Sequence, residues 1–254
     1  MRVMTFNVQH CLNYIENKID FDIMAKAIIE CGADVVGLNE MRDLGTDEEY
    51  QAQAEILAKL CGMEHYYFAK AYEFPGGPYG NAILSRIPIV KAETIPIPDP
   101  DPRGYDGYYE PRCILKAELA DGITVMVLHV GLNPDEKESA VATVVKNLAT
   151  EKCILMGDFN MTPDDKTLFP IYEKMKDAAR GFCDKKLSFP SVDPYCKIDY
   201  VFVSKDVKVT GADNAAFEFL QVIEPATTTA TGWAFTSDSI ANNYKDAFGV
   251  ADDA

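Results

Sequence analysis

The chain has 254 residues and carries 24 Lys and Arg against 40 Asp and Glu, which gives a formal net charge of −16. A surface this acidic repels polyanions and argues against tight binding to duplex nucleic acid. Hydrophobic residues make up 48% of the chain and charged residues 25%, a globular composition that excludes a disordered protein. We expect one domain over residues 1–254, because single α/β domains of about 250 residues are common.

The sequence has no run of about 18 apolar residues that could cross a membrane. Its first ten residues, MRVMTFNVQH, have the pattern of a strand and not of a secretory signal. We therefore expect a cytoplasmic protein without a membrane span; no oligomeric state is predicted. The seven cysteines contain no CxxC pair, so we expect reduced thiols and neither a disulfide framework nor a structural zinc site.

Apolar patterning predicts alternating strands and helices up to about residue 211, with hairpin neighbours that indicate mixed sheets. Strands are expected at residues 2–8, 33–38, 66–69, 80–84, 89–95, 113–119, 124–129, 153–156, 198–203 and 207–209. Helices are expected at 21–31, 48–61, 139–149 and 164–175, the third after a helix-start signal at 133–136. Beyond residue 225 the pattern fades into Thr, Ser, Asn and Asp, and we expect an irregular tail.

Several of these strands end in side chains that carry chemistry. They are Asn7, Glu40, His129, Asp158 and Asn160, with Asp199 in the strand near residue 200. A strand end is a rigid mount that leaves a side chain free at the rim of a sheet. Converging Asp, Glu and Asn side chains suit Mg²⁺ or Mn²⁺, whereas zinc prefers more His and Cys. A phosphate ester is the natural substrate of such a site.

Taken singly, most of these residues also have a structural explanation. Asn7 and Asn160 could be turn residues, because Asn hydrogen-bonds its own backbone. His129 could be a hydrogen-bonded core residue. Glu40 resists this explanation best, since a carboxylate at the end of a buried apolar strand is costly unless a cation or a donor compensates it.

Six short motifs follow one another along the chain. They are TFN at 5–7, GLNE at 37–40, YGNAILSR at 79–86, LHVGLN at 128–133, MGDFN at 156–160 and KIDYVFVS at 197–204. In this order they resemble the endonuclease/exonuclease/phosphatase superfamily, the DNase I-like metal-dependent phosphoesterases. The resemblance implies a four-layer α/β sandwich in which two mixed sheets pack face to face, with helices on the outer faces and an active site at one rim.

The resemblance also implies roles for individual residues. Glu40 would be the principal metal ligand, with Asn7 beside it and Asp238 completing the shell. Asp158 would align the attacking water, while Asn160 and His129 would hold the non-bridging phosphate oxygens.

Three further residues acquire roles in the same way. Asp199 is similar to the family carboxylate that orients a catalytic histidine base. Arg112 and Asn81 are similar to residues that face the phosphate, Arg112 through its guanidinium.

The chain departs from the family pattern at its end. The family closes with Ser-Asp-His before an apolar strand, whereas Ser237, Asp238 and Ser239 stand here. A serine hydroxyl has no accessible proton affinity near pH 7, and loss of a positioned base typically removes about 10²- to 10⁴-fold of rate. Either another group, such as Asp199 through a water, takes the proton, or the chain is a degenerate member that binds metal and a phosphorylated ligand with little turnover.

The expected substrate is a small phosphorylated molecule or a short nucleic acid strand, because Lys and Arg are not clustered. The Tyr-rich segment 99–110 has acids near the spacing of an EF-hand loop, but Arg103 occupies its fifth position. We favour a long insertion whose tyrosines lie near the substrate entrance, where they could stack on a base or a sugar.

Overall fold

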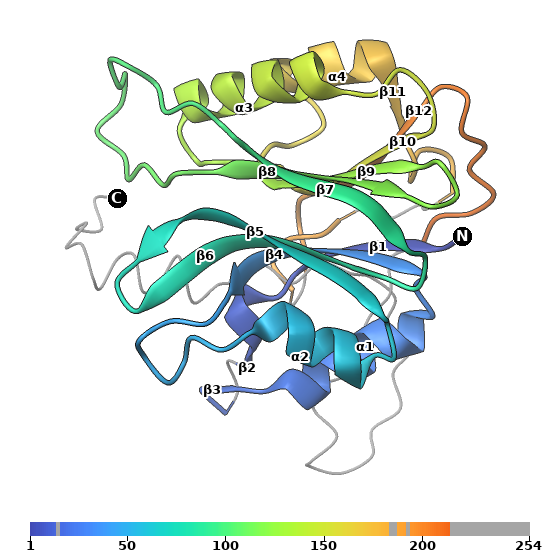
Figure 1. Cartoon of the computed structure of the whole chain (residues 1–254). Helices are drawn as coiled ribbons and strands as arrows, with labels where there is room; N and C mark the ends of the chain where they lie inside the picture. The colour runs from blue at the N-terminus through green and yellow to red at the C-terminus, as the bar shows by residue number, and fades with distance from the viewer. Residues whose placement is uncertain (14–15, 183–186, 192–193, 214–254) are drawn as a thin grey trace.

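The computed structural model describes residues 1–13, 16–182, 187–191 and 194–213. Within these residues, two main β-sheets pack face to face and helices cover both outer faces (Figure 1). The expected four-layer α/β sandwich with two mixed sheets is therefore confirmed. The tail expected beyond residue 225 lies outside the described residues.

The first main sheet has the strand order β1-β4-β6-β5. Its strands are β1 (Val3–Asn7), β4 (Val35–Arg42), β5 (His65–Phe74) and β6 (Gly77–Ser85). Helices α1 (Phe21–Cys31) and α2 (Gln53–Leu60) cover its outer face, and η1 (Gln9–Cys11), β2 (Leu12–Asn13) and β3 (Lys18–Ile19) lie between β1 and α1 in the chain. The sheet is mixed because β1 and β4 are parallel and the other pairs are antiparallel.

The second main sheet has the order β11-β12-β10-β9-β8-β7. Its strands are β7 (Ile89–Pro96), β8 (Cys113–Leu119), β9 (Thr124–His129), β10 (Cys153–Asp158), β11 (Met175–Asp177) and β12 (Asp199–Ser204). Its outer face carries α3 (Pro134–Asn147) and α4 (Phe169–Lys174), the latter preceded by η2 (Lys166–Leu168). Only β9 and β10 pair in parallel among these strands.

Alternation along the strands divides the apolar side chains into three layers. On β10, Ile154 and Met156 pack between the two sheets, whereas Cys153 and Leu155 face α3 and α4. Successive strand residues point to opposite faces, so one buried strand supplies two cores. The stacked layers bring the ends of β1 and β4 next to the ends of β9 and β10.

Gly157 is a point of close approach in this stack. A Cβ atom built on it would lie 1.8 Å from the Leu128 carbonyl oxygen, and its φ of +146° disfavours other residues. We expect Gly157→Ala to lower the free energy of unfolding by about 3 kcal/mol or more in urea denaturation. Gly211→Ala is the control, because nothing lies within 4 Å of the added atom; equal stability of the two variants would contradict this packing.

Two expected helices are shorter in the structure. The helix expected at 48–61 begins only at Gln53, because buried Tyr50 lies under the Arg42 guanidinium and accepts a backbone hydrogen bond from Gly45. The helix expected at 164–175 is reduced to α4, with Pro170 in its first turn. Proline has no N–H to donate and is tolerated only at such a helix start.

The strand expected at 207–209 does not form. Val207 closes a turn on Ser204, and Lys176 of β11 donates its ammonium protons to the carbonyls of Lys205 and Val207. Val207 and Val209 pack against the core between the sheets, so their apolar spacing reflects packing and not strand pairing. In the part of the chain that the structure describes, no helix is long and apolar enough to cross a bilayer.

Candidate active site

The topology gathers the chemistry-bearing strand ends at one rim. In the parallel pair β1 and β4, Asn7 lies opposite Asn39, and in the parallel pair β9 and β10, His129 lies opposite Asp158. The antiparallel strand β12 begins at the same rim, where Asp199 lies opposite Asp158. Both sheets thus contribute side chains to one place.

Asn7 joins the carboxylates of the two sheets. Its Nδ2 donates to Glu40 Oε1 at 2.8 Å and to Asp158 Oδ2 at 3.3 Å, and its Oδ1 accepts from the Gln9 N–H at 3.1 Å. The amide nitrogen, and not the oxygen, therefore faces the carboxylates. Ligation of a metal by Asn7 stays a prediction and requires the carboxamide to turn over.

Glu40 sits at a register shift of β4 between Leu38 and Met41, with a φ of +58°. The bulge turns its carboxylate into the rim, where the residue is only 3% exposed and Oε2 has no hydrogen-bond partner. Burial raises the pKa of Glu40 to about 7, although the hydrogen bond from Asn7 and the charge of Arg112 lower it in part. A cation beside this oxygen would compensate the buried charge.

Asp158 lies near Glu40, and Asp199 lies opposite Asp158 on the neighbouring strand. Asp158 accepts from the Asn160 N–H at 2.9 Å, and burial raises its pKa to about 6. The Asp199 backbone N–H donates to Ser188 Oγ at 3.0 Å, and its Oδ2 is buried without a hydrogen-bond partner. Burial, and then the negative charge of Asp158, raises the pKa of Asp199 well above its usual value. The rim therefore buries three carboxyl groups in surroundings that disfavour their negative charge.

His129 lies between two donors. Its Nδ1 is 2.8 Å from Arg112 Nη1, and its Nε2 is 3.2 Å from Asn160 Nδ2 and 3.7 Å from Asp158 Oδ2. Asn160 also donates to the Val130 carbonyl at 2.9 Å, which fixes the orientation of its amide. Burial, and then the charge of Arg112, lowers the pKa of His129 well below its usual value, so the imidazole is neutral.

The two expected phosphate-binding residues have protein partners. Arg112 Nη1 forms an ion pair with Glu110 Oε1 at 2.9 Å in addition to its contact with His129. Asn81 donates to the Cys113 carbonyl at 3.0 Å and accepts from Asn39 at 2.8 Å. Their contacts with phosphate stay predictions.

Sequence reasoning missed two residues of this region. Asn39 is fully buried and ties the sheets together, since its Nδ2 donates to the Leu128 carbonyl at 2.9 Å and its Oδ1 accepts from the Asp158 N–H at 3.0 Å. An asparagine inside the apolar run VVGLNE was the available signal. Glu110 gave no such signal, because its pairing with Arg112 depends on how the preceding loop folds.

The donor set fits a hard divalent cation. Glu40 and Asp158 supply carboxylate oxygens, one of them without a hydrogen-bond partner, and Mg²⁺ usually takes one or two carboxylates with waters and substrate oxygens. No group of three His, Cys, Asp or Glu residues with metal-ligand geometry occurs within the described ranges. The expected ligand Asp238 and the position of Ser239 lie outside those ranges.

The chain is similar to one protein family over most of its length. Residues 4–214 match the model of the Endonuclease/Exonuclease/phosphatase family. No curated protein matches the sequence.

Three solved structures with the same fold are named for different proteins. An endonuclease/exonuclease/phosphatase from Beutenbergia cavernae is 22% identical with a TM-score of 0.68, over 81% of this chain and 64% of that one. A mannosyl-6-phosphatase from Bacteroides thetaiotaomicron is 18% identical with a TM-score of 0.60, over 80% and 85%. The 3′ phosphatase NExo from Neisseria, bound to a product DNA hairpin, is 15% identical with a TM-score of 0.56, over 81% and 87%. At these identities the likeness extends to the fold alone.

Proposed function

Because the chain belongs to the endonuclease/exonuclease/phosphatase family, we propose that it hydrolyses a phosphate ester by in-line attack of water on phosphorus. The family supports a hydrolase of the phosphoesterase or nuclease type. The observation that carries the proposal is the convergence of Asn7, Glu40, His129, Asp158 and Asn160 from both sheets at one rim.

The carboxylates have two proposed roles, which are to bind the metal ion and to orient the attacking water. Glu40 and Asp158 would hold a Mg²⁺ or Mn²⁺ ion, which would supply positive charge where negative charge develops on the phosphoryl oxygens. Asp158, fixed by the hydrogen bonds from Asn7 and Asn160, also orients the attacking water. Asp238 is proposed as a further ligand from the family pattern.

Asn160, His129 and Arg112 supply the hydrogen-bond donors of the site. Asn160 Nδ2 and His129 Nε2 lie 3.2 Å apart, so a non-bridging phosphate oxygen placed beside both would accept a hydrogen bond from each. Because both residues are held before substrate arrives, these donors need no rearrangement during the reaction. Arg112 acts on the phosphate through its charge and through its contact with His129.

The proton of the attacking water needs an acceptor. We assign this role to Asp199, whose Oδ2 is buried without a hydrogen-bond partner beside Asp158. Burial, and then the negative charge of Asp158, raises its pKa well above the usual value, so the carboxylate is a stronger base than an exposed aspartate.

The proposed substrate is a small phosphorylated molecule, such as a sugar phosphate, or a short single strand. The net charge of −16 disfavours long polyanions. The similar folds include proteins named for a mannosyl phosphate and for a DNA 3′ phosphate.

The first test compares a phosphomonoester, glucose 6-phosphate, with a phosphodiester, bis(4-nitrophenyl) phosphate, each in Mg²⁺, Mn²⁺ and EDTA. We expect metal-dependent turnover that is faster with the sugar phosphate. Turnover that is equal in EDTA would contradict the proposed use of Glu40 and Asp158.

A second candidate is a binding protein that has lost turnover with the expected histidine, favoured by Ser239 in the family pattern. Ser239→His separates the two, and the hydrolase proposal expects the natural protein to be active without this substitution. If the natural protein is inactive and Ser239→His hydrolyses the same esters, the binding function is correct. Ser237→His is the matched control, since it adds the same imidazole two residues away.

A further inference from the structure

Arg112 presents the same nitrogen to two acceptors. Its Nη1 forms an ion pair with Glu110 Oε1 at 2.9 Å, without the geometry of a hydrogen bond, and a hydrogen bond of 2.8 Å with His129 Nδ1, for which a guanidinium Nη has a proton to donate. Burial disfavours the charged form of Arg112, but Glu110, Tyr79 and Glu40 hold its pKa above the usual value, so Arg112 stays charged. A charged guanidinium can only donate. His129 Nδ1 must therefore accept.

A neutral imidazole has one N–H and one bare nitrogen. We infer that Glu110 and Arg112 are positioning residues that hold neutral His129 in the tautomer with its proton on Nε2. The opposite tautomer would bring Nδ1–H against a guanidinium N–H at 2.8 Å, two donors at hydrogen-bond distance with no acceptor between them. The role in phosphate binding rests on the proposed function; the tautomer itself does not.

In this tautomer, His129 Nε2–H and the Asn160 amide form a pair of neighbouring donors. Asn160 Nδ2, also a donor, lies 3.2 Å from Nε2, so these two N–H groups do not satisfy each other. Asp158 Oδ2 lies 3.7 Å from Nε2, beyond a good hydrogen bond. The Val130 carbonyl takes one Asn160 Nδ2 proton, and the other Asn160 N–H together with Nε2–H suits an anionic oxygen such as that of a phosphate.

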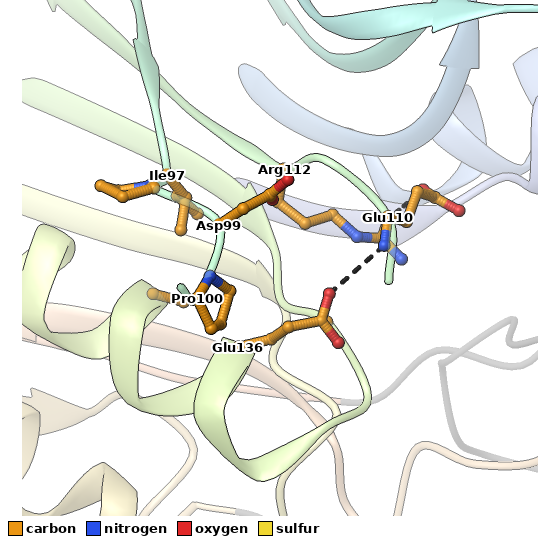
Figure 2. A pocket seen from close by; sticks show the side chains of 9 residues that line it. Ile97, Asp99, Pro100, Glu110, Arg112 and Glu136 are labelled. Carbon is orange, nitrogen blue, oxygen red and sulfur yellow. Dashed lines mark hydrogen bonds and ion pairs between the residues drawn. The ribbon is translucent and has the colours of Figure 1, made fainter. Parts of the chain in front are cut away.

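Glu110 is held in place by the loop that it ends. Figure 2 shows Glu110, Arg112 and Glu136 around one small hollow, and the Glu110 N–H donates to Glu136 Oε1 at 3.3 Å. Upstream in the loop, Gly104 N–H and Tyr109 OH donate to Asp135 Oδ2 at 2.9 Å and 2.8 Å. The start of α3 therefore fixes the loop, the loop fixes Glu110, and Glu110 fixes the Arg112 guanidinium.

The Glu110–Arg112 pair is also shielded from water. The Glu110 side chain is 14% exposed and that of Arg112 is 13% exposed, so the ion pair is screened less than a surface pair. Removing Glu110 leaves the guanidinium without its charged partner and free to turn away from His129.

The tautomer can be read directly by nitrogen-15 NMR of the imidazole rings. The chain has only three histidines, and His10→Gln and His65→Gln variants assign the third ring by elimination. We expect His129 of the natural protein to carry its proton on Nε2, and inorganic phosphate to shift that N–H signal. A proton on Nδ1 would overturn the inference without any variant being needed.

Variants test which residues hold the tautomer. In Arg112→Met we expect a mixture with the Nδ1–H form, and in Arg112→Lys, which keeps a cationic donor, the Nε2–H form is restored. Glu110→Gln is expected to broaden or split the His129 signals because the guanidinium is less fixed. If Arg112→Met folds and its His129 keeps the Nε2–H form alone, the inference is wrong.

Kinetics separate this inference from the proposed function. Where the natural protein turns over, Arg112→Met is expected to lower kcat by about 10²-fold with a small change in KM, as for loss of a transition-state donor. A natural protein that shows the Nε2–H tautomer and hydrolyses nothing would overturn the proposed function and leave the tautomer assignment standing.

Discussion

Asp158→Asn is expected to lower kcat by about 10³-fold, near the middle of the range for losing a group that handles the attacking water. Asp158 lies where the two sheets meet, and it is held by Asn7 at 3.3 Å and by the Asn160 N–H at 2.9 Å. Asparagine keeps the shape of the side chain and one oxygen but removes the negative charge that binds the cation and polarises the water. Steady-state kinetics with the metal at saturation measure this loss.

Asp22→Asn is the matched control for Asp158→Asn. Asp22 is exposed in the first turn of α1, on the outer face of the first main sheet, and its replacement removes the same charge far from the rim. We expect its kcat to equal that of the natural protein. If Asp158→Asn is folded and keeps more than about a tenth of the natural kcat, Asp158 does not have the role we assign to it.

Glu40→Gln is expected to abolish the stabilisation of the fold by Mg²⁺. A ligand present at 100 times its dissociation constant stabilises a protein by about 2.7 kcal/mol, which corresponds to a rise of about 5–10 °C in Tm for a domain of this size. Glu40 Oε2 is a buried carboxylate oxygen without a hydrogen-bond partner, so the variant loses a ligand that is available to the cation. Thermal unfolding with Mg²⁺ and with EDTA measures the difference.

Without metal, the same variant is expected to be at least as stable as the natural protein. The Glu40 carboxylate is buried with its pKa raised to about 7, so neutral glutamine avoids part of the cost of a buried charge. Glu138→Gln, at an exposed position of α3, is the control and is expected to keep the full Mg²⁺ effect. A Mg²⁺-induced rise in Tm that is the same in all three proteins would contradict the assignment of Glu40.

The elements that were predictable from the sequence are those with local signals. Helix α1 follows Asp20, whose side chain accepts from the Ile23 N–H at 3.1 Å, and it ends at Gly32 in the left-handed conformation. The start of α3 at Pro134 follows the Asn133 and Glu136 capping pattern. Propensity and capping act over a few residues, so the sequence displays them directly.

The elements that were missed depend on contacts between distant segments. Residues 48–52 have a helical composition, yet the packing of Tyr50 under Arg42 keeps them out of α2. Val207 and Val209 alternate like a strand because they pack against the core between the sheets. Tertiary packing overrides local preference at such places, and one sequence carries no record of it.

In the candidate site too, residues with a local signal were predictable and residues that depend on distant contacts were not. Glu40 and Asp158 stood out because each carboxylate closes an apolar run of the sequence, and their motifs occur in the family order. Asn39 could have been noticed as a polar residue in an apolar run, but its partners at Leu128 and Asp158 are far away in the chain. The role of Glu110 follows only from the fold of the loop that ends there.

The most direct test of the proposed hydrolysis is release of inorganic phosphate from glucose 6-phosphate in ¹⁸O-labelled water, with Mg²⁺ or EDTA. Attack of water on phosphorus predicts release that requires Mg²⁺, with one solvent oxygen in each phosphate. Asp158→Asn measured beside the natural protein sets the background. Release without solvent oxygen, or at the same rate in EDTA and in Asp158→Asn, would contradict catalysis by this site.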